Sequence, residues 1–234
     1  MLIEVLTDFL FPPRCPNCRD YVERRGAWCT DCAQRLCGLH RIVQLRGMTA
    51  CSAGIWAFGY YREGVRDLVR ALKYQGKKEV LPYLHAMLAA GDEVFEQLPK
   101  PLIAVPVPLA RERERLRGFN QVAEIFGPWL ARHSIPLVPL LCRTRETAPL
   151  YERTRAERRK ELRGAFSLCA EADIGGLADP AMCSACAEAD IGGRDILLVD
   201  DIMTTGTTLE ECARMLRHAG AGRVYAFVLA SEHM

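Results

Sequence analysis

An apolar stretch that runs directly into two acids and a threonine-rich turn sets the strongest limit on how this chain can fold. The run Ile196–Val199 has no polar residue, which is typical of a central parallel strand buried on both faces. Asp200 and Asp201 follow at once, and successive side chains of a strand point to opposite sides of its sheet. Open α/β sheets bind ligands at the carboxyl ends of their strands, so we expect the two acids to border a binding site.

The turn after the acids has the composition of a phosphate site. It supplies hydroxyl groups and backbone amides at the start of a predicted helix, where the helix dipole favours an anion. Gly206 allows the backbone to approach a ligand closely. Phosphate-binding residues beside acids that can bind neighbouring hydroxyls predict a ribose 5-phosphate ligand. An ordinary N-capped helix would explain one threonine but not both acids and four threonines, so the predicted phosphate-binding residues are Thr204, Thr205, Gly206, Thr207 and Thr208.

Strand and helix patterns alternate along most of the chain. Aromatic or continuous apolar runs predict strands, and apolar residues at helical spacing predict helices. We expect strands over 55–61, 102–107, 137–141, 196–199 and 224–229, and helices over 65–72, 79–96, 119–132 and 208–219. This alternation predicts an α/β domain over residues 51–234, with a mainly parallel sheet flanked by helices.

Length and composition exclude several classes of protein. The chain has 234 residues, 50% hydrophobic and 26% charged, with a formal net charge of +2. This balance excludes an intrinsically disordered protein, and no apolar run is long enough for a transmembrane helix. Glu4 and Asp8 lie where a signal peptide would have a basic and then an apolar stretch. We therefore expect a cytoplasmic protein that does not insert into membranes.

Two closely spaced cysteine pairs predict a metal site near the N-terminus. Cys15 and Cys18 form one C-x2-C pair, and Cys29 and Cys32 form a second. Together they provide the four thiolates that tetrahedral zinc prefers. Residues 1–50 are too few to bury a sufficient core alone, so a structural zinc ion would supply folding free energy to this small domain.

The cysteines of the two pairs, and the other cysteines of the chain, have alternative interpretations to a zinc site. A C-x2-C pair can be redox-active, but such a pair normally begins a helix of a thioredoxin-like unit, which the surrounding sequence does not resemble. Idle thiols are another alternative, and Cys37 and His40 are spare candidate ligands. The chain has eleven cysteines, and in a reducing cytoplasm we expect thiols rather than disulfides.

Eight residues occur twice in the sequence. Cys169–Gly176 is repeated letter for letter as Cys186–Gly193, at an offset of 17. Two copies are too few for a repeat architecture, so we interpret the segment at about 169–193 as a surface loop lengthened by tandem duplication. A second metal site that uses the cysteines of this segment, including Cys183, is an alternative, although their spacing is not typical of zinc.

The segment Ile196–Thr208 closely resembles the phosphoribosyl pyrophosphate (PRPP) signature of type I phosphoribosyltransferases. The resemblance implies that Thr204–Thr208 holds the 5-phosphate and that Asp200 and Asp201 are the catalytic acids, in contact with the ribose hydroxyls. It also implies that Mg²⁺ enters with the pyrophosphate of PRPP. Such a metal would be held mostly by substrate oxygens.

Further motifs extend the resemblance to nearly the whole chain. ComF-family proteins are competence-associated and carry a zinc ribbon before a phosphoribosyltransferase-like domain. The motifs of this chain occur in the order found in that family: Ala71–Tyr74, Val105–Pro108, Arg117–Gln121, Arg143–Thr147 and Gly164–Phe166. The resemblance implies additional PRPP contacts at Lys73, Val107 and Arg117.

Two functions follow from this resemblance. The first is an Mg²⁺-dependent transfer of the phosphoribosyl group of PRPP, with release of pyrophosphate, that is linked to DNA uptake in natural competence. The sequence does not identify the acceptor. The alternative is a non-catalytic module that senses PRPP or handles single-stranded DNA together with proteins of the competence machinery.

Basic segments bear on both functions. Arginine and glutamate alternate over 111–117, a pattern typical of a solvated, salt-bridged helix face. Residues 143–163 carry eight Arg or Lys against four Asp or Glu, and this excess suits closure over pyrophosphate or contact with a nucleic-acid backbone. No Walker A motif is present, which excludes a P-loop ATPase.

Overall fold

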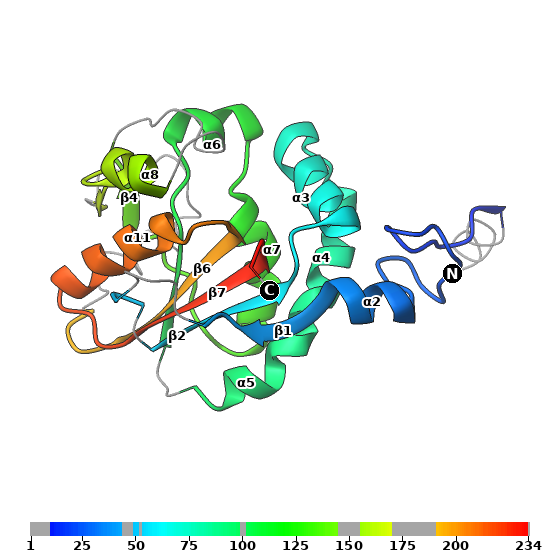
Figure 1. Ribbon diagram of the computed structural model, residues 1–234, viewed down its shortest axis with the longest axis horizontal. Coiled ribbons are helices and arrows are strands. Elements are labelled where there is room, and N and C mark those ends of the chain that lie inside the picture. The colour runs from blue at the N-terminus through cyan, green and yellow to red at the C-terminus, as the bar shows by residue number, and fades with distance from the viewer. Residues whose placement is uncertain are drawn as a thin grey trace.

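The computed structural model describes residues 10–43, 49–51, 53–98, 102–144, 155–169 and 191–233. Its centre is a five-stranded sheet in the order β1–β2–β7–β6–β3, with helices on both faces (Figure 1). The strands are β1 (Cys37–Arg41), β2 (Gly54–Gly59), β3 (Leu102–Pro106), β6 (Asp195–Met203) and β7 (Val224–Ser231). The neighbouring strands from β2 to β3 are parallel, whereas β1 runs antiparallel to β2. The predicted α/β architecture with a mainly parallel sheet is therefore confirmed.

Two groups of helices cover the two faces of the sheet. The first face carries α3 (Glu63–Gln75), α4 (Leu81–Leu88), α5 (Asp92–Glu96) and α7 (Gln121–Arg132), and the second carries α8 (Arg155–Leu162) and α11 (Thr207–His218). In β6, Leu197 and Val199 pack into the first core, while Ile196 and Leu198 pack into the second. This is the two-sided burial that the apolar run predicts.

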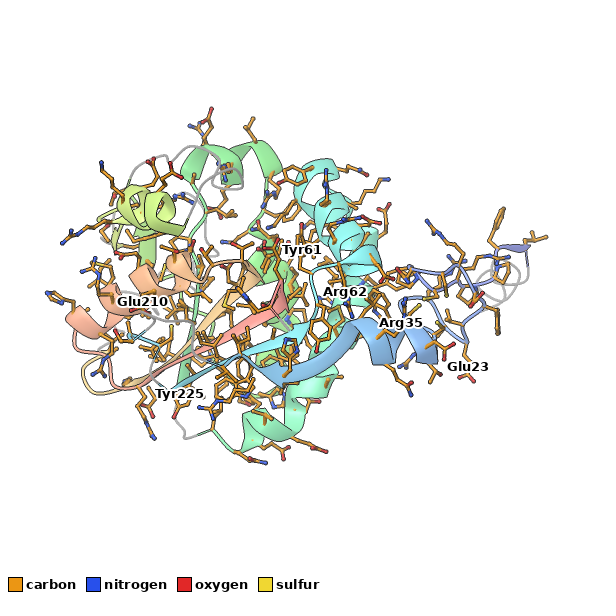
Figure 2. All side chains as sticks on the ribbon, in the orientation of Figure 1. Glu23, Arg35, Tyr61, Arg62, Glu210 and Tyr225 are labelled. Atoms are coloured by element: carbon orange, nitrogen blue, oxygen red, sulfur yellow. A yellow bond between two sulfur atoms is a disulfide. The ribbon has the colours of Figure 1, made fainter. Side chains whose placement is uncertain are left out.

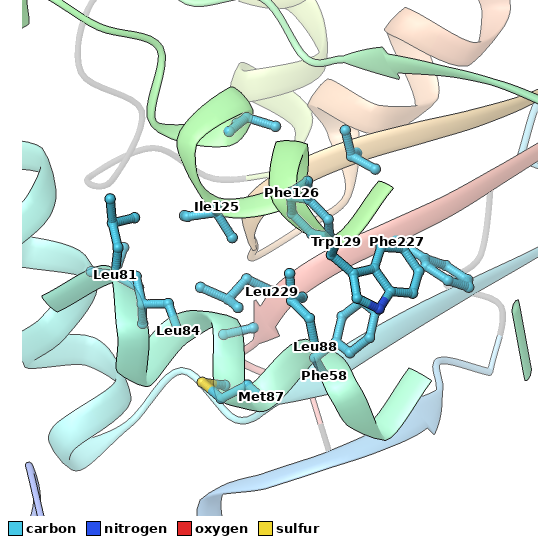
Figure 3. Close-up of a cluster of buried hydrophobic side chains, with 14 of the residues drawn as sticks. Phe58, Leu81, Leu84, Met87, Leu88, Ile125, Phe126, Trp129, Phe227 and Leu229 are labelled. Atoms are coloured by element: carbon cyan, nitrogen blue, oxygen red, sulfur yellow. The ribbon is translucent and has the colours of Figure 1, made fainter. Parts of the chain in front are cut away.

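Aromatic side chains form the centre of the first core (Figure 3). The rings of Phe58 in β2, Trp129 in α7 and Phe227 in β7 have centroids 5.5 to 6.0 Å apart. Phe58 makes edge-to-face contacts with the other two rings, and such contacts at this separation are favourable beyond the area that they bury. They fix α7 against the sheet, and the first residue of α7, Gln121, lies at the functional site described below.

The N-terminal segment projects from the main body beyond α2 (Thr30–Leu36) in Figure 1. It is nevertheless joined to the first core, because Cys15, Val22 and Leu36 are buried within that cluster. After α2 the chain enters β1, which pairs with β2 of the main sheet. A domain boundary near residue 50 therefore stays a prediction.

One predicted helix is divided. In place of a single helix over 79–96, the chain forms η1 (Lys78–Val80), α4, η2 (Ala89–Gly91) and α5. Pro82 lies in the first turn of α4, a position that tolerates proline because the amide there has no intrahelical partner. Gly91 lies against Phe58, and a Cβ atom at this position would meet the ring at 2.3 Å. The spacing of apolar residues in the sequence predicts neither the break at Pro82 nor the close contact of Gly91 with Phe58.

Two strand predictions are also displaced. The predicted strand at 137–141 is realised as β4 (Leu141–Arg143), which pairs in antiparallel fashion with β5 (Phe166–Leu168), and Leu137 forms an isolated bridge to Ala104. The predicted strand at 196–199 continues in β6 to Met203, since Ile202 and Met203 still pair with β7. The two acids therefore lie inside the strand. The arginine-rich segment, for which a solvated helix face was predicted, forms a short helix, α6 (Arg111–Arg117).

Candidate functional site

A cavity of about 380 Å³ opens at the carboxyl ends of β6 and β7. The predicted phosphate turn and both acids contribute to its wall, which contains Tyr61, Lys73, Leu162, Glu232 and the continuous stretch 200–209. Tyr61 follows β2 at the same edge of the sheet, beside the end of β7 (Figure 2). The structure thus brings together Thr204–Thr208, the two acids and Lys73. Val107 lies outside this wall, and its amide donates to the carbonyl oxygen of Val199.

The turn between β6 and α11 has the form of an anion site. Gly206, the N-cap of α11, has a φ of 73°, a left-handed conformation that glycine adopts without strain. The first amides of α11 have no intrahelical acceptor and point out of the helix N-terminus. The hydroxyls of Thr205 and Thr207 lie 2.9 Å apart and add further donors to the same wall. An oxyanion in this cavity would meet amides, hydroxyls and the positive end of a helix dipole.

The structure divides the two acids between the two faces of the sheet. Asp201 is buried on the side of α3 and α7, where its Oδ1 accepts from Lys73 Nζ at 2.8 Å and its Oδ2 accepts from Gln121 Nε2 at 2.8 Å. Both carboxylate oxygens are therefore engaged by the protein itself. Burial alone would lower the pKa of Lys73, but the charge and hydrogen bond of Asp201 outweigh it and raise that pKa.

Asp200 has the opposite environment. Burial, and next the negative charge of Asp201, raise the pKa of Asp200 to about 8, while the charges of Lys73 and Arg143 oppose this shift. Its Oδ1 accepts the backbone amide of Asp201 at 2.8 Å. Near neutral pH, Asp200 is therefore largely protonated, whereas Asp201 forms an ion pair with Lys73. Two adjacent acids with different environments take different chemical roles.

Gln121 is a site residue that the sequence interpretation missed. Its Oε1 accepts from the guanidinium of Arg117, which leaves its Nε2 to donate to Asp201. Arg117 also donates from Nε to the carbonyl oxygen of Lys73 at 3.0 Å. Arg117 therefore supports the site through Lys73 and Gln121 and does not line the first cavity. The sequence feature that could have identified Gln121 as a site residue is its position at the end of the Arg117–Gln121 motif.

The last strand supports the phosphate turn from behind. His233 Nε2 donates to the carbonyl oxygen of Thr204, and the amide of Glu232 donates to the carbonyl oxygen of Met203 at 3.1 Å. The amide of Tyr61 donates to the carbonyl oxygen of Ser231 at 2.8 Å, which joins β2 to the same edge. No sequence motif pointed to these three C-terminal residues, because their role depends on the pairing of β7 with β6.

A second cavity of about 510 Å³ lies between the end of α3 and α6. It shares Lys73 with the first cavity, and its wall consists of Lys73, Tyr74, Gln75, Gly76, Arg113, Leu116 and Arg117. The wall therefore contains three cationic side chains and no carboxylate. Tyr74 and Leu116 are large side chains that are mostly exposed, at 76% and 82%.

The four predicted zinc ligands are gathered in one place. The sulfur atoms of Cys15, Cys18, Cys29 and Cys32 all lie within 4.8 Å of one another, a spacing compatible with tetrahedral zinc. Burial raises the pKa of Cys15, but the backbone amides around it outweigh burial and lower that pKa to about 7. These amides favour the thiolate that zinc requires. Among the described residues, Cys37 and His40 lie outside the group of four, and the His40 ring stacks on Tyr60.

Contacts behind the cysteines tie this site to the main body. Asn17 accepts from the amide of Gly64 at 2.8 Å, and its Nδ2 lies 3.3 Å from the sulfur of Cys32. Trp28 Nε1 donates to the carbonyl oxygen of Tyr83 at 2.9 Å. A metal in the ribbon would therefore also order the contacts between the ribbon and helices α3 and α4.

One disulfide corrects the expectation of free thiols. Cys142 and Cys169 are bonded to each other. Cys142 lies in β4 and Cys169 follows β5, so the antiparallel pairing of these strands places the two residues side by side. The pairing depends on the register of β4 and β5, which the number and spacing of the cysteines in the sequence do not predict. Most of the duplicated segment lies outside the described residues, but Ile191 of the second copy is buried and the amide of Gly193 bonds the carbonyl oxygen of Gly220.

Two family models match separate parts of the chain. The model for a phosphoribosyl transferase domain matches residues 167–233, which include β6, the phosphate turn and α11. The model for a double zinc ribbon domain matches residues 6–42, which include the four clustered cysteines. These matches confirm a structural zinc site in front of a type I phosphoribosyltransferase fold. No helix in the described part of the chain is both long and apolar enough to cross a membrane.

Curated relatives match over most of the chain. Competence protein F of Haemophilus influenzae is 26% identical over 223 residues, which cover 93% of this chain and 84% of the relative. DNA utilization protein YhgH of Escherichia coli K12 is 27% identical over 227 residues, covering 92% and 82%. Competence protein ComFC of Bacillus subtilis is 28% identical over 173 residues, covering 72% and 60%. The similarity therefore extends across both the ribbon and the sheet.

Proposed function

This chain belongs to the ComF family, and from that premise we propose that it binds PRPP and transfers its phosphoribosyl group with release of pyrophosphate. We place this activity in the cytoplasm, in support of DNA uptake. The proposal is supported chiefly by the cavity in which the phosphate turn, both acids and Lys73 meet at one sheet edge. The names of the relatives, competence protein and DNA utilization protein, support the biological setting.

The proposal gives each part of this cavity a role. The 5-phosphate lies on the turn Thr204–Thr208, where amides and hydroxyls offer hydrogen bonds. Asp200 faces the ribose hydroxyls and accepts hydrogen bonds from them after it loses its proton. Asp201 holds Lys73 at the border between the two cavities, where the ammonium group meets the negative charge of the substrate. The protein thus fixes the sugar by its phosphate and its hydroxyls before the reaction begins.

The reaction itself exchanges one bond at the anomeric carbon. The C1–O bond to pyrophosphate breaks with its electron pair on the leaving oxygen, and the acceptor nucleophile forms the new bond to C1. A Mg²⁺ ion bound by PRPP would stabilise the charge of the leaving pyrophosphate. The donor set fits such a cation, because Asp200 and Glu232 are carboxyl groups of the same wall that Lys73 does not bind, and magnesium keeps mostly substrate and water ligands.

Calorimetric titration of the protein with PRPP and Mg²⁺ tests this proposal. The double variant Asp200→Asn/Asp201→Asn is expected to lose PRPP binding by more than about tenfold, because it removes both ionisable carboxyl groups while keeping the size of the side chains. Asp67→Asn, at an exposed carboxylate of α3, is the matched control and is expected to bind as the wild type does. Retention of affinity by the double variant, with circular dichroism unchanged, would mean that the cavity is wrongly assigned.

A second candidate is a non-catalytic module that senses PRPP or handles single-stranded DNA with competence-machinery partners. It is favoured by the ion pair between Lys73 and Asp201, which keeps both groups engaged without substrate. Pyrophosphate release distinguishes the two candidates. An enzyme releases pyrophosphate from PRPP when an acceptor is added, whereas a sensing module binds PRPP and leaves it intact.

A further inference from the structure

The cavity between α3 and α6 has a chemical character that the phosphate cavity lacks. It combines two large exposed side chains, Tyr74 and Leu116, with the cation of Arg113, which belongs to the same short helix as Leu116. Exposed aromatic and aliphatic side chains that line one cavity provide a surface for a flat apolar ligand. The shared residue Lys73 places this surface directly beside the cavity assigned to the ribose and its phosphate.

The charges of this cavity are not equally available. Lys73 is paired with Asp201, and Arg117 is held by the carbonyl oxygen of Lys73 and by Gln121. Arg113, by contrast, is exposed and has no assigned ion pair among the residues that the structure describes. One available guanidinium suits a single carboxylate, with which it forms a two-point contact. Pyrophosphate carries several negative charges and would need more cations than this one.

Tyr74 lines the second cavity, next to Lys73, which is the residue that the two cavities share. Its hydroxyl is close enough to Tyr61, in the wall of the phosphate cavity, and to Arg117 to influence the pKa of each group. Tyr74 also follows Lys73 directly in the chain. A ring packed on Tyr74 would therefore lie in the cavity that adjoins the proposed ribose 5-phosphate site at Lys73.

We propose that this second cavity is the acceptor site and that it takes a planar aromatic carboxylate with a nucleophilic nitrogen, an inference that rests on the function proposed above. The ring packs against Tyr74 and Leu116, and the carboxylate binds Arg113. For an aminobenzoate, the amine nitrogen forms the bond to C1 as the C1–O bond breaks. The electron pair of that bond leaves with pyrophosphate, and the amine gives one proton to water.

Matched pairs of probes test the acceptor class. The pairs are 2-aminobenzoate with 2-aminobenzamide and pyridine-3-carboxylate with pyridine-3-carboxamide, which differ only in the charge that Arg113 would bind. Binding is measured by calorimetry to protein saturated with ribose 5-phosphate, which fills the first cavity and cannot transfer. Pyrophosphate release is measured with PRPP and Mg²⁺. We expect at least one carboxylate to bind and react about tenfold better than its amide.

Two variants locate the contact. Arg113→Gln is expected to remove the preference for the carboxylate, and Tyr74→Ala is expected to weaken both members of a pair about tenfold. Neither variant should change PRPP affinity. Arg115→Gln on the same helix and Tyr21→Ala on the ribbon are exposed controls outside the cavity, and they should behave as the wild type. All four positions are on the surface, so we expect each variant to fold.

Three results would overturn this acceptor assignment while PRPP binding by the wild type stands. The first is equal use of carboxylates and amides, and the second is failure of every carboxylate to bind. The third is loss of PRPP affinity in Arg113→Gln or Tyr74→Ala, which would assign the cavity to pyrophosphate instead. Failure of the wild type to bind PRPP is a separate result, and it would remove the proposed function together with this inference.

Discussion

At the scale of single residues, the two neighbouring acids show how one strand gives two chemical groups from one residue type. Asp201 faces α3 and α7 and is matched by Lys73, whereas Asp200 faces the other side and has a pKa raised to about 8. The strand periodicity predicted the opposite directions. It did not predict the partners, because Lys73 and Gln121 reach Asp201 from positions 128 and 80 residues away.

The buried acid at Asp200 has a cost for stability that depends on pH. In the unfolded chain this carboxyl ionises near pH 4, and in the folded protein it keeps its proton up to about pH 8. Folding therefore binds a proton in this window, and its contribution to stability falls as the pH rises. We expect Asp200→Asn to be more stable than the wild type at pH 8, by about 2 kcal/mol or more, with a smaller difference at pH 5.5.

Urea unfolding at several pH values measures this effect. Asp195→Asn is the contrasting variant, because Arg223 and its backbone amide lower the pKa of Asp195 and that carboxylate stabilises the folded state above about pH 4. It should therefore be less stable than the wild type at pH 8. A stability difference for Asp200→Asn that does not change with pH would show that the carboxyl ionises normally.

The amide of Gln121 gives a second residue-scale prediction. Gln121→Leu removes one hydrogen-bond partner from Asp201 and one from Arg117, so we expect a loss of about 1–3 kcal/mol in the free energy of unfolding. We also expect weaker PRPP binding, since Asp201 and Lys73 lose their support. Gln34→Leu, at an exposed position of α2 outside both cavities, is a control for the loss of an amide. Wild-type stability and affinity in Gln121→Leu would contradict the bridging role.

At the scale of elements, local patterns predicted the type of most helices and strands, and tertiary contacts decided where they end. The run at Ile196–Val199 identified β6, but pairing with β7 extends that strand to Met203. The apolar spacing over 79–96 identified helical structure, but Pro82 and the contact of Gly91 with Phe58 divide it. The hairpin of β4 and β5 and its disulfide depend on a register between distant segments, which no local pattern contains.

The zinc ribbon should be separable from the PRPP cavity. The cavity wall comes from Tyr61 onward, whereas the four ligands lie between Cys15 and Cys32. We expect Cys15→Ser/Cys18→Ser to lose one equivalent of zinc by elemental analysis and to lower the stability of the ribbon, because the metal supplies its folding free energy. Cys37→Ser is the matched control and should keep its zinc. PRPP affinity should be unchanged in both, and retention of zinc by the double variant would place the site elsewhere.

The disulfide between Cys142 and Cys169 stabilises a hairpin whose strands have three residues each. We expect Cys142→Ser/Cys169→Ser to lower the free energy of unfolding by about 2–4 kcal/mol relative to the oxidised wild type. Reduced wild-type protein should match the variant. Mass spectrometry of an unreduced digest checks the pairing directly, and absence of the linked peptide from the purified protein would contradict it.

At the scale of the whole molecule, the sheet brings together segments from both ends of the chain. Tyr61 follows β2, the phosphate turn follows β6, and His233 follows β7 and holds Thr204. The fold and the phosphate turn were predictable, since an apolar strand, two acids and a glycine-containing turn are adjacent in sequence. The second cavity was not, because α3 and α6 are separate in sequence and meet only in the folded chain.

Competition against PRPP by fragments of its structure tests most directly whether the turn after β6 holds the 5-phosphate. The measurement is the apparent affinity for PRPP, by calorimetry, in the presence of ribose 5-phosphate, ribose or pyrophosphate. Ribose 5-phosphate is expected to compete strongly and ribose hardly at all, because the phosphate contacts at Thr204–Thr208 anchor the sugar. Strong competition by pyrophosphate with none by ribose 5-phosphate would contradict the account.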